Sequence, residues 1–159
     1  DLIYFSQDVK KIKQVKVAGF MKKHPVFASV PEEALLSLAE ACSLDHIQEG
    51  SIIVNPSAYT EDVTIMVQGR AVLYGEPDGG WRNPVRILKA GSFLNMGALT
   101  GETRPRNLVL NDTEEVMVLS IPNEAFQEFL YDYPSVSLRL ISQIEREKQD
   151  YMRLWVKAL

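Results

Sequence analysis

The chain has 159 residues, which suits a single globular domain, and with 46% hydrophobic and 24% charged residues its composition is that of an ordinary folded protein. Its formal net charge of −4 supplies no overall cationic field for a nucleic-acid backbone, so we expect no nucleic-acid binding by this chain. No apolar stretch approaches the roughly 20 residues of a membrane-spanning helix and no signal-peptide pattern opens the chain, so we expect no membrane insertion and a cytoplasmic location.

Cysteine and histidine are scarce. The single cysteine, Cys42, cannot form an internal disulfide, which favours a reducing compartment. With only His24 and His46, a multidentate soft-metal site is hard to assemble, so we assign neither histidine a role and expect no cofactor. The first residue is Asp1, and residues 155–159 still have a helical pattern. We therefore expect a piece of a longer protein, with a fused effector domain or a partner protein.

Residues 1–23 are rich in Lys, Gln and Val with a loose helical period, and we interpret them as an N-terminal helical linker. The run Lys10-Lys11-Ile12-Lys13 is either a solvated helix face or a contact with a neighbouring domain. After breaks at Pro25 and Pro31, a second helix is predicted to about Cys42. Proline stands in its first turn and acids lie near its positive end.

From Gly50 to about Ile121 the chain consists of short β-rich runs separated by turn residues, which predicts an antiparallel β body. The strongest hairpin signal is Glu76-Pro77-Asp78-Gly79-Gly80. Six strands are predicted: Ser51 to Val54, Val63 to Val67, Ala71 to Tyr74, Val85 to Leu88, Leu108 to Leu110 and Val116 to Ile121. Six short strands favour a roll or barrel.

Two further helices are predicted after the β body. Pro122-Asn123-Glu124 opens a helix that ends before Pro134, and Ser135 begins a long amphipathic helix that runs to the end of the chain. One face of the long helix is apolar: Val136, Leu140, Ile141, Ile144, Tyr151, Leu154 and Trp155. The predicted domain therefore covers residues 24–159, with a β-roll over about 47–121 and C-terminal helices over about 122–159.

Five segments in this order resemble the cyclic nucleotide-binding domain of regulatory kinases, gated channels and bacterial regulators, over about residues 20–155. They are Gly50 to Val54 (a G-x-x-I strand), Met66 to Tyr74 (strand, turn, strand), Gly91 to Phe93 with Leu99 to Glu102 (the two ends of a phosphate-binding cassette), and Phe126 to Pro134 (the helix before the lever helix). The resemblance implies a mainly β fold with flanking helices: an antiparallel β-roll of the jelly-roll or double-stranded β-helix kind, N-terminal helices and a long C-terminal helix.

In that family the cassette binds a cyclic phosphate through a helix N-terminus and one buried arginine, and a glutamate holds the ribose 2′-hydroxyl. Laid without gaps from Phe93, the family pattern F-G-E-x-A-L puts Leu94 at the glycine and Asn95 at the glutamate. Leucine adds bulk where the family brings backbone close to the ligand, and an uncharged amide would bind the hydroxyl more weakly.

The same register puts Arg104 at the arginine, while Pro105-Arg106 also resembles a frequent family pair, so Arg104 and Arg106 remain alternatives for the phosphate contact. The remaining ligand contacts that the resemblance implies are Met96, Gly97 and Ala98 in the cassette and Asn107 after it. Side chains of the last helix, Tyr151, Met152 and Trp155, either cover the base or pack in a core or dimer.

Two functions follow from the resemblance. In the first, the chain is a non-enzymatic sensor whose ligand, cAMP in preference to cGMP, enters the roll and repositions the C-terminal helix. In the second, it is a degenerate domain with no nucleotide ligand that serves as a module for homodimerisation through the terminal helix or for docking. No catalytic triad, carboxylate pair or P-loop stands out, so an enzyme is not expected. A helix-turn-helix after the lever helix would not fit in this chain.

Overall fold

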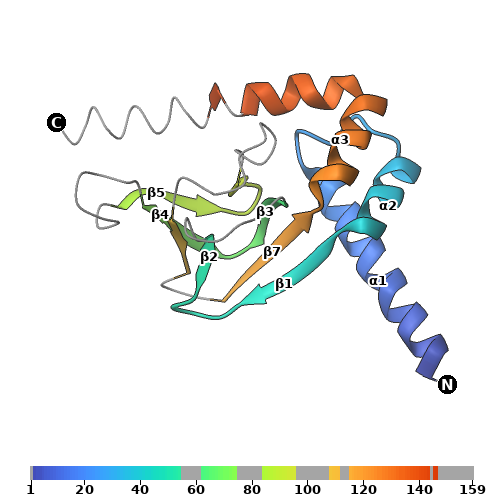
Figure 1. Cartoon of the computed structure of the whole chain (residues 1–159), viewed down its shortest axis with the longest axis horizontal. Helices are drawn as coiled ribbons and strands as arrows, with labels where there is room; N and C mark the ends of the chain where they lie inside the picture. Colours follow the sequence, from blue (N-terminus) through green and yellow to red (C-terminus); the bar gives the residue numbers. More distant parts are fainter. Residues whose placement is uncertain are drawn as a thin grey trace.

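The computed structural model describes residues 2–54, 62–74, 84–95, 108–111, 115–143 and 145–146. Helices flank a β body, as predicted: α1 (Leu2–Lys23) and α2 (Glu32–Ala41) come before it, and α3 (Asn123–Asp132) and a helix over residues 134–143 come after it. The strands of the described residues are β1 (Ser43–Ile47), β2 (Ile52–Val54), β3 (Val63–Gln68), β4 (Arg70–Tyr74), β5 (Pro84–Lys89), β6 (Leu108–Leu110) and β7 (Val116–Ile121). Figure 1 shows the helices gathered at one end of the β body.

The strands form two antiparallel sheets, one with the order β1-β7-β3 and the other with the order β2-β6-β4-β5. The predicted hairpin is confirmed by its flanks, because β4 and β5 pair from Arg70↔Lys89 to Tyr74↔Pro84, although the turn itself lies outside the described residues. The turn between β3 and β4 requires glycine. Gly69 has a φ of +96°, and a Cβ there would lie 2.8 Å from the carbonyl oxygen of Glu115.

Strand β1 was not predicted, and the β body therefore starts at Ser43 rather than near residue 47 or 50. Its sequence, SLDHI, contains two large apolar residues, and neither is fully buried. Its strand conformation depends on five residue pairs with β7, from Ser43↔Ser120 to Ile47↔Val116. A segment whose structure is set by a partner about 70 residues away carries a weak local signal.

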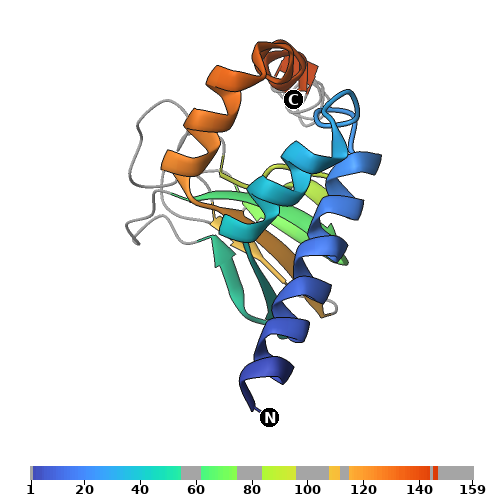
Figure 2. The same cartoon turned by 90° about the vertical axis from the view of Figure 1, so that its right-hand side faces the viewer.

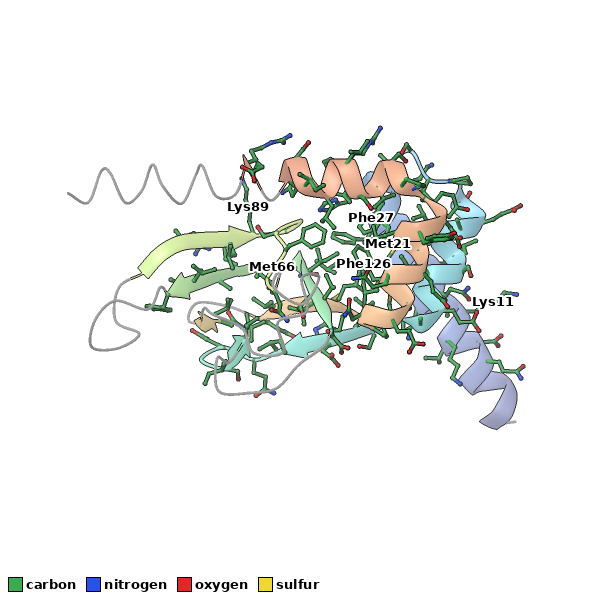
Figure 3. The ribbon with its side chains drawn as sticks, turned by 45° about the horizontal axis from the view of Figure 1, so that its top comes forward. Lys11, Met21, Phe27, Met66, Lys89 and Phe126 are labelled. Carbon is green, nitrogen blue, oxygen red and sulfur yellow. The ribbon has the colours of Figure 1, made fainter. Side chains whose placement is uncertain are left out.

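The sheet β1-β7-β3 separates two hydrophobic clusters. On β7, Leu119 and Ile121 belong to the cluster under the helices, whereas Val116 and Val118 belong to a cluster inside the roll. The same alternation occurs on β3, where Ile65 faces the helices, and successive side chains of a strand do point to opposite faces. Figure 3 shows the two sides, with Met21, Phe27 and Phe126 among the helices and Met66 in the roll.

The helical end of the molecule is packed closely. Val17 and Met21 of α1 are buried in the cluster under the helices, so the last turns of the predicted linker pack against the domain. The division of the chain at residue 23 stays a prediction. The sequence predicted Pro31 in the first turn of α2, whereas the structure has it as the N-cap residue, directly before the first helical residue, Glu32. The carbonyl of Pro31 accepts hydrogen bonds from the amides of Ala34 and Leu35.

The helix over residues 134–143 follows the predicted amphipathic pattern in part. Val136 and Leu140 are buried in the cluster under the helices, but Ile141 is exposed, because that cluster lies on the side of the helix that carries Val136 and Leu140. The rest of its predicted apolar face, from Ile144 to Trp155, lies outside the described residues. Among the described helices, none is long and apolar enough to cross a membrane.

Candidate ligand-binding site

The start of the predicted phosphate-binding cassette is hydrogen-bonded along the free edge of β3. The amide of Gly91 donates to the carbonyl of Met66 at 2.8 Å, and the amide of Met66 donates to the carbonyl of Ser92 at 2.9 Å. The amide of Leu94 then donates to the carbonyl of Thr64 at 2.8 Å, and Phe93 forms a bridge with Ile65. This edge ladder gives residues 91–94 the side-chain alternation of a strand.

The two central side chains of this segment point to opposite faces of the sheet. Phe93 belongs to the cluster under the helices and Leu94 to the cluster inside the roll. Leu94 is 6% exposed, so the side chain that replaces the family's glycine is part of the roll's core. The cassette therefore leaves the sheet at the border between the two clusters.

Asn95, at the place of the family's glutamate, is 5% exposed and its side chain has a structural partner. Its Nδ2 donates a hydrogen bond of 3.1 Å to the main-chain carbonyl of Asp62, at the start of β3. This bond uses one of the two donors of the amide and fixes the side chain beside the sheet. A contact between Asn95 and a ribose hydroxyl stays a prediction.

His24, which the sequence analysis left without a role, anchors the cassette from the helical side. It is 5% exposed and lies directly after α1. The amide of Val26 donates to its Nδ1 at 3.1 Å, so the ring proton is on Nε2, which donates to the carbonyl of Gly91 at 2.8 Å. The imidazole also meets the ring of Phe93 edge-on, with the centroids 5.5 Å apart.

The backbone conformation of Gly91 favours glycine, because its φ is +93°. Space is not the reason, since a Cβ there would lie 3.7 Å from the imidazole of His24, which is an ordinary van der Waals contact. The signal available in the sequence was a histidine at the end of a predicted helix, followed directly by Pro25. It does not identify a partner 67 residues away.

Asn111, which directly follows β6, is a second residue that the sequence analysis missed. It is fully buried, and its Nδ2 donates to the carbonyl of Ile47 at 2.9 Å. Its amide donates to the carbonyl of Ser51 at 3.0 Å, and its own carbonyl accepts from the amide of Gly50. Asn111 therefore holds the connection between β1 and β2 in place.

The other predicted ligand contacts fall outside the residues that the structure describes. These are Met96, Gly97, Ala98, Arg104, Arg106 and Asn107, together with Tyr151, Met152 and Trp155 of the last helix. Their roles stay predictions. In the described ranges, no three His, Cys, Asp or Glu side chains group in a way that could hold a metal ion.

The remaining titratable residues singled out in the sequence are placed away from the cassette start. Cys42 is buried at the end of α2, where its thiol donates to the carbonyl of Leu38. Burial raises the pKa of this thiol from 9.0 to about 12, and nearby Lys13 counteracts part of the effect. His46 of β1 and Glu115, directly before β7, are both exposed, and Nδ1 of His46 lies 2.9 Å from the carboxylate of Glu115.

Comparison with known proteins supports the resemblance seen in the sequence. The match to a cGMP-dependent protein kinase of Drosophila melanogaster (isozyme 2, forms cD5/T2) is 26% identical over 141 residues, which cover 86% of this chain and 15% of the kinase. The chain thus spans a small part of the curated relatives it matches.

Solved structures show the same fold. The regulatory subunit of a cAMP-independent protein kinase A from Trypanosoma brucei superposes with a TM-score of 0.72 at 18% identity, covering 95% of this chain and 53% of that one. The regulatory domain of Toxoplasma gondii PKA, crystallised with cAMP, gives a TM-score of 0.72 at 18% identity, covering 88% and 52%. The family model of the cyclic nucleotide-binding domain matches residues 44–133, more than half of this chain. The chain therefore belongs to the cyclic nucleotide-binding domain family.

Proposed function

We propose that this chain is a regulatory domain that binds a cyclic nucleotide between the β-roll and the cassette, and relays binding through its C-terminal helix to a fused or partner domain. The observation that carries the proposal is the start of the cassette. Residues 91–94 are held on the edge of β3 with Phe93 on the helical side and Leu94 on the roll side. A ligand that moves the segment after Asn95 acts next to both clusters, and one of them includes the C-terminal helix through Val136 and Leu140.

The chemistry of binding rests on the cassette. Main-chain amides of Met96, Gly97 and Ala98 at a helix N-terminus would contact the cyclic phosphate, and Arg104 or Arg106 would neutralise it. Asn107 would contact the phosphate or the base. We propose cAMP in preference to cGMP, because the Toxoplasma relative was solved with cAMP. The Drosophila relative is named for cGMP, so both nucleotides belong in the test.

A relay through the C-terminal helix needs two states that the ligand binds with different affinity. In this proposal the role of the chain is regulatory rather than catalytic, its location is cytoplasmic, and the domain on which it acts is fused to it or is a separate protein. Homodimerisation through the C-terminal helix is a further part of the proposal.

A second candidate is favoured by a specific observation. Leu94 fills the roll where the family has glycine, and Asn95 is bonded to Asp62 where the family has a glutamate for the ribose. A domain of this kind could keep the fold without a nucleotide ligand and serve as a dimerisation or docking module. The Trypanosoma brucei relative is described as part of a cAMP-independent kinase.

Titration with cAMP and with cGMP separates the two candidates. A ligand at a hundredfold excess over its Kd stabilises the native state by about 2.7 kcal/mol. In a domain of this size that raises Tm by roughly 5–10 °C. Arg104→Ala and Arg106→Ala are titrated in parallel, and the anchor is the arginine whose loss abolishes the shift. No shift and no heat of binding with either nucleotide would leave the docking module as the function.

A further inference from the structure

Asn95, the last described residue of the cassette start, adds its side chain to the edge ladder along β3. Carbonyls of residues two apart on a strand point to the same edge. On the free edge of β3 these are the carbonyls of Met66, Thr64 and Asp62. The first two accept from main-chain amides at 2.8 Å, whereas the carbonyl of Asp62 accepts from Nδ2 of Asn95 at 3.1 Å. The side chain of Asn95 therefore supplies the last hydrogen bond of the described ladder.

The bond to Asp62 requires a donor, which explains an amide at this position. An ionised carboxylate has no proton to donate, so glutamate or aspartate at residue 95 could not form this bond. The bond also fixes the orientation of the amide, because only its NH₂ end can donate to a carbonyl. Asparagine is thus the residue type that the ladder needs, rather than a weaker version of a ribose-binding carboxylate.

Burial leaves little of the Asn95 side chain for a ligand, since the residue is 5% exposed. The other buried polar side chains of the described residues, His24, Ser92 and Asn111, each bond to the main chain as well. Figure 2 shows the helices in front of the strands, and Phe93 packs under them, so the helices cover the cassette start on that side. Buried polar groups around the cassette start therefore hold the main chain in place.

We propose that Asn95 is a positioning residue, which holds the start of the cassette on β3 and makes no contact with the ribose. This inference rests on the proposed function, and it differs from the ribose contact that the resemblance implies for this position. Recognition then depends on the cyclic phosphate and the base. The ligand class therefore includes the cyclic phosphates of ribonucleosides and of 2′-deoxyribonucleosides alike.

Calorimetric titration of the whole chain with cAMP and with 2′-deoxy-cAMP tests the ligand class. The two nucleotides differ only in the 2′-hydroxyl, so we expect dissociation constants that agree within about twofold. A hydroxyl that formed a hydrogen bond with the site would instead make cAMP about three- to tenfold tighter. The same comparison with cGMP and 2′-deoxy-cGMP covers the case in which cGMP is the tighter ligand.

Asn95→Ala tests the positioning role. Without the hydrogen bond to Asp62 the cassette start is held less often in the binding geometry, and we expect both dissociation constants to rise about fivefold. The ratio between the two nucleotides should stay the same. Asn111→Ala is the matched control, because Asn111 is also buried and its Nδ2 also donates to a main-chain carbonyl. It should lower Tm but leave both dissociation constants within about twofold of the wild type.

Asn95→Asp keeps the size of the side chain but replaces the donor by a charged acceptor. It should also weaken both nucleotides, with their ratio unchanged. Hydrogen exchange without nucleotide gives a second readout. In Asn95→Ala the amide of Leu94 should exchange about fivefold faster than in the wild type, because the next hydrogen bond of the ladder is lost. Asn111→Ala should leave the exchange of that amide unchanged.

Several results would overturn the proposal. If cAMP bound more than about threefold tighter than 2′-deoxy-cAMP, the site would recognise the hydroxyl, and loss of this difference in Asn95→Ala would assign the contact to Asn95. A preference for cAMP that appears only in Asn95→Asp would place residue 95 within reach of the ribose. If Asn95→Ala changed neither binding nor exchange at Leu94, the side chain would not position the cassette.

Failure of the proposed function gives a different result. If neither nucleotide bound at all, the proposed function and the ligand class would both be wrong. Exchange at the amide of Leu94 would still decide whether Asn95 holds the cassette start, because that measurement needs no ligand.

Discussion

The two hydrophobic clusters on either face of the sheet β1-β7-β3 are built from different side chains. The cluster under the helices contains Phe27, Phe93, Phe126 and Phe129, which are in ring contact with one another or with His24. The cluster inside the roll is smaller and, among the described residues, consists of aliphatic side chains and Met66. The cluster under the helices is thus the larger of the two and contains aromatic rings in mutual contact. The cluster inside the roll is smaller and lies next to the proposed ligand site.

The sharpest test of this difference is to remove a ring from the helical side. Phe126→Ala should lower the free energy of unfolding by about 3–5 kcal/mol, because the side chain is fully buried among other rings and leaves a cavity. Urea denaturation followed by circular dichroism measures the loss. Leu138→Ala, on a side chain that is 69% exposed, is the control and should cost little. If Phe126→Ala lowered the free energy of unfolding as little as the control does, the aromatic cluster under the helices would not be the main source of stability.

On the roll side, Leu94→Ala should cost about 2–5 kcal/mol, at the lower end if the smaller cluster collapses around the gap. The same substitution opens space beside the proposed ligand site. If Leu94 narrows the pocket, the variant should bind cAMP or cGMP more tightly than the wild type despite its lower stability. Calorimetric titration of both proteins checks this. Weaker binding by Leu94→Ala would show that the leucine supports the site instead.

A smaller effect is expected at the contact that joins the helical side to the cassette. His24→Leu preserves bulk but removes the hydrogen bonds to Gly91 and Val26, which should cost about 1–3 kcal/mol. Faster hydrogen exchange at the amides of Gly91 and Leu94 would show that the hydrogen bonds along the edge of β3 open more often in the variant. His46→Leu, on an exposed histidine, is the matched control. Unchanged exchange at the cassette start would mean that His24 only fills space.

An effect that is absent near neutral pH is a dependence of stability on alkaline pH that comes from Cys42. Its pKa is raised from 9.0 to about 12 by burial, so the unfolded chain loses the thiol proton at lower pH than the folded chain. The stabilisation is complete below pH 9 and is lost as the pH rises from about 9 toward 12. Cys42→Ala should therefore flatten the fall of Tm over that window. If Tm of the variant fell equally steeply over that window, the pH dependence would come from groups other than Cys42.

The architecture was largely predictable because its signals are local. Runs of β-branched residues between turn residues marked six of the seven described strands, and the Glu76-Pro77-Asp78-Gly79-Gly80 turn marked the β4–β5 hairpin. The cassette start was found by its resemblance to a family pattern. The positions of Leu94 and Asn95 were also recognised as departures from that pattern, but their contacts with the roll core and with Asp62 were not predictable.

By itself, the sequence determined the class of fold, the order of helices and strands, and the family, since these follow from propensity, periodicity and motif spacing. Only the tertiary structure decided that β1 is a strand, that Phe93 and Leu94 point to opposite clusters, and that His24 holds Gly91. Each of these depends on a partner far along the chain, which the pairing of strands and the docking of α1 bring within hydrogen-bond or van der Waals distance.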